Sequence, residues 1–254
     1  MTRLLPALLA APALLFSSAA LAQDEPPPAN PLSQGPDAPK APTVFDGDYL
    51  TVGVGYAYGP GYEGSDSYVA FPVAGFQGRL LGFTISPAPA GVAIDLINER
   101  GNQKIGFNLG PDARARFDRN RQIRDPAVLA LGKRDVAIEV GGTAGISINR
   151  ITNPYDSLSF GVDVRKDVAG AHGGLLVQPN ISFLTPLSPS TGVVLNVSAD
   201  HVDDDYARYY FDVTPGGSLA SGLPTYRARA GWKNVSTSLV AMHDLDGNIG
   251  NGGS

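Results

Sequence analysis

The residues of this chain best suited to chemistry are its three histidines, His172, His201 and His243, and the groups beside them. A serine-type hydrolase needs a nucleophile, a histidine and an orienting acid brought together. Ser198, Asp200 and His201 are close in sequence, but in an extended segment His201 lies on the opposite face from the other two. No G-x-S-x-G motif occurs. A hydrolase therefore ranks last among the functions considered, and we expect no enzyme activity and no catalytic or cofactor-binding residue.

Two further groups of charges could bind ions. Asp203, Asp204 and Asp205 are consecutive carboxylates, the oxygen ligands that divalent cations prefer. They lack the spaced D-x-D-x-D-G pattern, and adjacent side chains of an extended segment diverge, so a solvated turn is favoured. The chain has no cysteine, which excludes disulfides and thiolate metal sites. We expect no metal site and no cofactor.

Arginines are concentrated between Arg114 and Arg124, within the longest interruption of the pattern, residues 111–132. Arginine forms bidentate contacts with phosphate, so this cluster could hold anionic sugar phosphates or a polyanion. The acidic residues interleaved with it weaken its field: Asp112, Asp118 and Asp125. A charged external loop, or a strand extension standing out of a membrane, is favoured over a specific anion site.

These charges are carried by segments in which apolar and polar residues alternate. The clearest example places Leu158, Phe160, Val162 and Val164 in one row, with Ser159, Gly161, Asp163 and Arg165 in the other. Residues of one row share a face of a β-strand. Turns rich in Gly, Pro, Asn and Asp separate the segments, and no amphipathic helix of useful length is found. About twelve candidate strands follow, three of them weak: residues 80–86, 92–97 and 234–242.

The polar rows carry charges well inside the strands, and five of these would face the interior: Glu139, Asp163, Arg165, Arg227 and Arg229. A soluble sandwich also alternates. A wet, charged interior behind an apolar outer band is typical of a transmembrane barrel, as are aromatic residues near strand ends. Such residues are Tyr56, Tyr58, Tyr68, Phe71, Phe183, Tyr206, Tyr209, Tyr210, Phe211 and Trp232. We predict an all-β, transmembrane, antiparallel up-and-down β-barrel of about 12 strands.

The interior charges allow two interpretations. They could tune a pore, or they could form an ion-pair network that fills a closed barrel. Small residues in the polar rows favour a tight interior: Gly53, Gly55, Gly106, Gly161 and Gly231.

Composition and the N-terminus indicate where the protein works. Charged residues make up 17%, against roughly 25% in soluble globular chains, and the net charge of −5 argues against a nucleic-acid partner. Arg3, a 13-residue apolar stretch and Ala20-Leu21-Ala22 predict a cleaved signal peptide over residues 1–22. Residues 23–45 are a Pro-rich periplasmic linker and residues 46–254 form the barrel. The expected location is the cell outer membrane.

Several stretches together resemble the MipA/OmpV family. A Gly-rich strand runs into the sequence Pro60-Gly61-Tyr62-Glu63-Gly64-Ser65, which is similar to the family's P-x-Y-x-G-S loop. Further similar stretches follow in the family's order, at residues 71–73, 163–174, 205–213 and 226–232. The resemblance covers roughly residues 46–245.

The resemblance implies an outer-membrane barrel that acts as a scaffold, tethering a lytic murein transglycosylase to a murein synthase. It supplies no catalytic residue. The expected partners are these two enzymes and outer-membrane lipid; the alternative function is a small-solute channel. Family members usually end with one more hairpin and a terminal aromatic residue, whereas the sequence given stops at Ser254. We therefore expect a barrel lacking its last hairpin, with an open edge, that inserts poorly.

Overall fold

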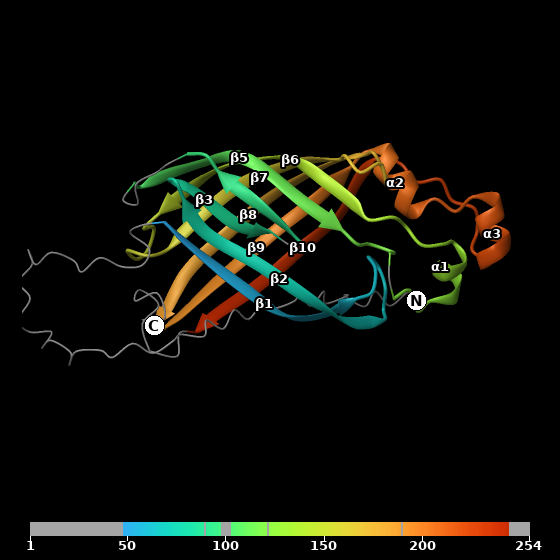
Figure 1. Ribbon diagram of the computed structural model, residues 1–254, viewed down its shortest axis with the longest axis horizontal. Coiled ribbons are helices and arrows are strands. Elements are labelled where there is room, and N and C mark those ends of the chain that lie inside the picture. The colour runs from blue at the N-terminus through green and yellow to red at the C-terminus, as the bar shows by residue number, and fades with distance from the viewer. Residues whose placement is uncertain (1–47, 89, 98–102, 121, 189, 244–254) are drawn as a thin grey trace, which may run out of the picture.

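The computed structural model describes residues 48–88, 90–97, 103–120, 122–188 and 190–243. Within them, ten strands form one antiparallel sheet in which each strand pairs with the next along the chain (Figure 1). The strands are β1 (Tyr49–Pro60), β2 (Tyr68–Leu80), β3 (Phe83–Ala88), β4 (Gly91–Asp95), β5 (Ile105–Arg116), β6 (Ala137–Asn149), β7 (Ser157–Asp167), β8 (Leu175–Ser188), β9 (Thr191–Val202) and β10 (Gly231–His243). The predicted all-β, antiparallel, up-and-down architecture is confirmed, while the predicted signal peptide and linker lie outside the described residues.

The sheet curls around a common interior as a half-barrel (Figure 1). No ladder joins β1 to β10 within the described residues, so both remain edge strands. Arg227 and Arg229, predicted to lie well inside a strand, do not, because within the described part of this segment only Tyr226 makes a bridge, to Val213, and regular pairing begins at Gly231. No helix among the described residues is long and apolar enough to cross a membrane.

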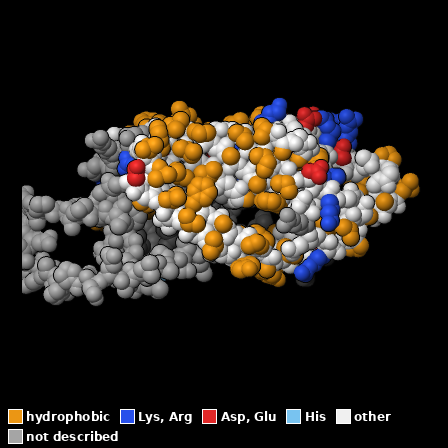
Figure 2. Space-filling view, in the orientation of Figure 1, with side chains coloured by type: hydrophobic (Ala, Val, Ile, Leu, Met, Phe, Trp, Pro, Cys, Tyr) orange, Lys and Arg blue, Asp and Glu red, His pale blue; other side chains and the backbone are white. Residues whose placement is uncertain are grey.

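The predicted alternation of faces is confirmed along the strands. On β7, Phe160 and Val162 point outward with 40% and 37% of their surface exposed, whereas Arg165 on the inner face is 3% exposed. Outward side chains of the edge strand β1 are far more exposed, reaching 81% at Tyr56, because β1 has a neighbouring strand on one side only. Hydrophobic side chains cover much of the visible strand surface (Figure 2).

The two ends of the sheet differ. At one end lie the connections β2–β3, β4–β5, β6–β7 and β8–β9; we call this the short-turn end. At the other, the capped end, β5–β6 carries α1 (Pro126–Ala130), and β9–β10 carries α2 (Asp204–Phe211) and α3 (Pro215–Ser221) (Figure 1). Each strand of an up-and-down sheet runs from one end to the other. The alternate connections therefore gather all three helices at one end.

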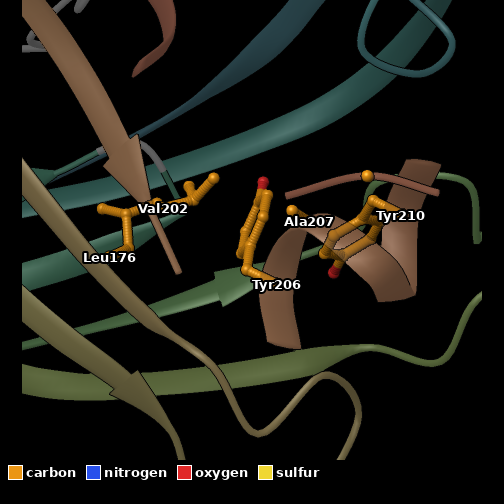
Figure 3. Packing of buried hydrophobic residues seen from close by; sticks show 6 residues of the cluster. Leu176, Val202, Tyr206, Ala207 and Tyr210 are labelled. Carbon is orange, nitrogen blue, oxygen red and sulfur yellow. The ribbon is translucent and has the colours of Figure 1, made fainter. Parts of the chain in front are cut away.

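Helix α2 replaces the predicted solvated turn, and the prediction that no useful amphipathic helix exists is wrong. Asp203 caps it, accepting a hydrogen bond from the Tyr206 N–H at 2.9 Å, and two acids occupy its first turn. Such an N-terminus satisfies free backbone donors and complements the helix dipole. Tyr206, Ala207 and Tyr210 form the buried face. They pack with Leu176, Val202 and Ala228 in the main apolar cluster (Figure 3).

Candidate functional site

The interior at the capped end holds a buried network of ion pairs. Arg116 on β5 and Glu139 on β6 form a two-point contact, with Nε 2.5 Å from Oε1 and Nη2 3.3 Å from Oε2. Arg116 is 7% exposed and Glu139 is fully buried. A buried ion pair is maintained only where good geometry offsets the cost of removing both charges from water. The bidentate arrangement meets that requirement.

Arg165 on β7 connects four neighbouring strands. Its Nη1 lies 2.7 Å from Asp112 Oδ2 on β5 and 3.4 Å from Asp163 Oδ2. Its Nη2 donates to Gln178 Oε1 on β8 at 2.8 Å, and its Nε lies 3.7 Å from Glu139 Oε2. One guanidinium therefore links β5, β6, β7 and β8 across the inner face.

A glycine makes that link across β6 geometrically possible. Gly141 pairs with Asp112 on one side and with Arg165 on the other. Because it has no side chain, Asp112 and Arg165 can meet above it. A Cβ there would also collide with the Val164 carbonyl of the adjoining strand.

A second set of charged residues connects the two edges of the sheet. Lys233 Nζ on β10 lies 2.7 Å from Glu63 Oε1 in the β1–β2 turn and 3.1 Å from Asp200 Oδ2 on β9. Asn234 donates to Glu63 Oε1 at 2.9 Å, and Gln178 donates to Asp200 Oδ1 at 2.6 Å. These contacts, which we call the Glu63–Lys233 latch, hold the β1–β2 turn against β10 although no ladder pairs the two edge strands.

Helix α2 closes this polar interior at the capped end. The ring of His172 stacks edge-on against Tyr206, with centroids 4.9 Å apart. Its Nδ1 accepts a hydrogen bond from the Gly174 N–H at 3.0 Å, so in the neutral ring the proton is on Nε2, which lies 3.4 Å from Glu139 Oε1. His172 thus connects the helix to the ion-pair network.

Two cations also lie over the ring of Tyr206. Cζ of Arg116 and Nζ of Lys233 are each 5.2 Å from the ring centroid. Burial raises the pKa of the Tyr206 and Tyr210 hydroxyls. Nη1 of Arg119 donates to the Tyr210 carbonyl at 2.6 Å and ties the β5–β6 segment to α2. Aromatic and cationic groups together therefore seal the capped end. The assignment of Tyr206 and Tyr210 to a membrane-facing girdle is wrong.

Three of the predicted interior charges, Glu139, Asp163 and Arg165, do lie on the inner face and are linked through Arg165. The other two are misplaced: Arg227 and Arg229 are exposed on the irregular segment before β10. Between them, Ala228 faces inward into the apolar cluster.

The predicted surface cluster of arginines is divided. Arg114 and Arg116 belong to β5 and face the interior, which agrees with the strand-extension alternative and not with the external loop. Arg119 is buried and Arg124 is exposed, while Arg121 lies outside the described residues. The inward parity of Gly106, Asn108 and Gly110 extends unbroken through Asp112 to Arg116. The sequence contains this alternation, but its charged residues favoured the interpretation as a surface segment.

The hydrolase residues do not assemble. Asp200 faces inward and bonds to Lys233, whereas His201 packs edge-on against Trp232 at 5.3 Å on the outer face. His243 pairs with Thr191 Oγ1 at 2.8 Å, far along β10. Within the described ranges no group of three or more metal-ligating side chains is found.

Sequence reasoning gave no role to Glu63 or to the latch residues Lys233 and Asn234, and it named His172 without placing it in the interior. The register shifts between Trp232 and Asn234, so a bulge places both Lys233 and Asn234 near the interior. A strict period of two cannot anticipate such a shift. Glu63 lies in a turn, where alternation carries no information.

Comparisons with known proteins gave one match. A search of the curated proteins found no relative, and a search of the solved structures found no similar fold. A family profile described as MltA-interacting protein MipA matches residues 52–254. That range includes every strand from β2 to β10 and most of β1, with the whole ion-pair network. Because the match covers most of its length, the chain belongs to the MipA family.

Proposed function

We propose that this protein is an outer-membrane β-barrel that acts as a scaffold for murein enzymes and does not conduct solutes. The observation that carries the proposal is the division between its faces. Apolar side chains point outward along the strands, and a cross-linked charged interior lies behind them. A lipid-facing band around a polar lumen is the arrangement of outer-membrane barrels. A shallow outer groove of about 380 Å³ over β5–β7, lined by Leu109, Ala144 and Val162 among others, would be filled by lipid.

The two ends support an orientation in the membrane. Bacterial barrels have short periplasmic turns and longer external loops. The short-turn end therefore faces the periplasm and the helical cap faces outward. The expected Pro-rich linker would then enter β1 from the periplasmic side, where Tyr49 begins the sheet.

Closure of the barrel belongs to the same proposal. Unpaired backbone groups are costly in hydrocarbon, so the edges of β1 and β10 must be satisfied in the membrane. The Glu63–Lys233 latch already draws the two edges together at the capped end. The predicted closed barrel of about 12 strands would complete this seam with further strand pairing.

The interior favours the scaffold over the channel. A permeating ion would have to break the Arg116–Glu139 pair or pass the Tyr206 seal, and both are buried. Separating a buried ion pair leaves uncompensated charges, which is strongly unfavourable. The family description names interaction with MltA, and murein lies in the periplasm, so we place the enzyme contact at the short-turn end.

Site-specific photocrosslinking in intact cells tests this assignment. A photoreactive residue replaces Tyr155, which is 76% exposed in the β6–β7 turn, and the matched control replaces Leu219, which is 91% exposed on α3. We expect the lytic transglycosylase to be captured from position 155 and not from position 219. Capture from position 219 alone, or from neither position, would reject the periplasmic docking surface.

Planar-bilayer recording tests the alternative function. The purified full chain should give no stepwise current. Reproducible, salt-dependent steps that disappear on changing Arg165 would establish the channel instead.

A further inference from the structure

Arg114 differs from the paired interior cations Arg116, Arg165 and Lys233. It points inward from β5 between Asp112 and Arg116, and its Cα partner on β6 is Glu139. Glu139 nevertheless directs its carboxylate to Arg116, His172 and Arg165. Within the part of the chain that the structure describes, no carboxylate lies within ion-pair distance of Arg114. Its Nε is buried without a hydrogen-bond partner.

Other polar atoms beside Arg114 are also unsatisfied. Nε of Arg165 has no hydrogen-bond partner, and the nearest carboxylate oxygen, Oε2 of Glu139, is 3.7 Å away. Asp112 uses Oδ2 for Arg165 and leaves Oδ1 unpartnered. Arg165 is 3% exposed and Asp112 is 6% exposed. Buried donors left without an acceptor are costly, so the unpartnered Nε–H groups of Arg114 and Arg165 indicate an acceptor that satisfies them. Oδ1 of Asp112 instead needs a donor, which the hydroxyl of a protonated oxyanion such as hydrogen phosphate supplies.

We propose that Arg114 anchors a binding site inside the barrel for one small oxyanion, a phosphate or a carboxylate. The guanidinium fork matches the planar spacing of such oxygens, and the Nε–H of Arg165 supplies a second donor. The carboxylates that act on Arg114, Glu139 and Asp200, are already paired with Arg116 and Lys233, and Asp112 is paired with Arg165, so they oppose the bound anion only weakly.

The approach to this site runs from the short-turn end. On that side the inner face of β5–β10 carries small, neutral, polar side chains: Asn108, Thr143, Asn180, Ser198 and Ser236. They present hydrogen-bonding groups to a hydrated anion, while the charged residues Arg79 and Asp95 of this half belong to β2 and β4. On the other side the site is closed by Tyr206 and its cations. A free solute from the periplasm can reach Arg114 by this route, whereas a lipid headgroup held in the outer leaflet cannot.

Calorimetric titration of the full chain in detergent with inorganic phosphate tests the site at constant ionic strength set by chloride. We expect one phosphate per chain. Arg114→Gln should weaken binding by tenfold or more, because a hydrogen bond to a charged group is worth about 1.5–3 kcal/mol. The matched control Arg227→Gln changes an exposed arginine outside the network and should bind as the parent does. Absence of binding in the parent, or equal binding by Arg114→Gln, would overturn the proposal.

Thermal unfolding separates a binding role from a structural one. Arg114→Gln removes a cation without an ion-pair partner, so its Tm without phosphate should equal or exceed that of the parent. Phosphate should raise the Tm of the parent and not that of the variant. A Tm as low as that of Arg116→Gln would make Arg114 a structural residue and reject the site. Arg114→Lys keeps the charge but not the fork; it should fold and bind more weakly, and unchanged affinity would contradict the guanidinium contact.

Discussion

Along β5 to β10 the inner face of the sheet has a charged half and a neutral half, although both halves obey the same alternation. Toward the capped end its residues form the network centred on Glu139 and Arg165. Toward the short-turn end they are small and uncharged, and Asn180 fills the space above Gly161, whose Cβ would lie 2.9 Å from the Asn180 Oδ1. One half is held together by ion pairs under a helical seal, and the other by close packing of glycine and asparagine. The same strand geometry therefore allows the interior to be filled either by ion pairs or by closely packed small residues.

The comparison predicts that the largest loss of stability follows from Glu139→Gln. This change removes the carboxylate shared by Arg116, Arg165 and His172 and leaves buried guanidinium groups uncompensated. Breaking a buried pair in this way costs about 3–5 kcal/mol. Urea unfolding of the protein in detergent measures the difference. The control Asp163→Asn touches Arg165 at 3.4 Å from a partly exposed position and should cost about 1 kcal/mol or less; equal losses would contradict a central role for Glu139.

The second-largest predicted loss of stability follows from removing Lys233 from the Glu63–Lys233 latch. Lys233→Met leaves Asp200 and Glu63 without their cation, at a cost of about 3 kcal/mol, the low end for a buried pair, because Glu63 is partly exposed. Hydrogen exchange should quicken in residues 61–67 and 204–211, both of which depend on Lys233 or on Tyr206 beside it. Exchange in the turn at residues 150–156 should not change. Uniform acceleration along the chain would mean that the two halves are not independent.

A smaller effect tests the glycine that lets Asp112 and Arg165 meet. In Gly141→Ala the new methyl group collides with the Val164 carbonyl, so β6 and β7 must shift, at about 1–3 kcal/mol. Gly231→Ala is the matched control, because nothing lies within 4 Å of its added Cβ. Thermal unfolding of the two variants should separate them. If Gly231→Ala is the more damaging, the steric argument is wrong.

The smallest predicted effect on stability is at Asp156, in the β6–β7 turn of the short-turn end. Burial opposes ionisation of Asp156, but hydrogen bonds from the Thr152 hydroxyl and from backbone N–H groups of Ile151, Thr152 and Asn153 lower the pKa of its carboxyl. A folded-state pKa below the unfolded value of about 3.9 stabilises the fold above that pH, and the gain is lost as pH falls through the folded pKa. The stability difference between the parent and Asp156→Asn should therefore shrink below about pH 4. A difference that is constant with pH would show that the charge of Asp156 is not involved.

Local sequence patterns were sufficient for the strands because the pattern and the structure have the same period. The row Leu158, Phe160 and Val162 faces outward as predicted, and Glu139 and Arg165 face inward. The inference failed where a charge was taken as a sign of exposure, as for Arg114 and Arg116. It also failed at α2, where a stretch rich in tyrosine was assigned to the membrane interface. Its Asp203 cap and the four-residue spacing of Tyr206 and Tyr210 were the signals of a helix.

The chain by itself determined most of the strands, the face that each of their side chains takes and that the strands follow one another in order; the exceptions are residues 111–116 and the segment before Gly231. These properties depend on near neighbours and on a period of two. Only the tertiary structure decided which charges meet, because Glu63 and Lys233, or Asp112 and Arg165, are brought together by curling of the sheet and by register across strands that lie between them. Whether an interior arginine is paired or left to bind something else depends on distances that no local pattern contains.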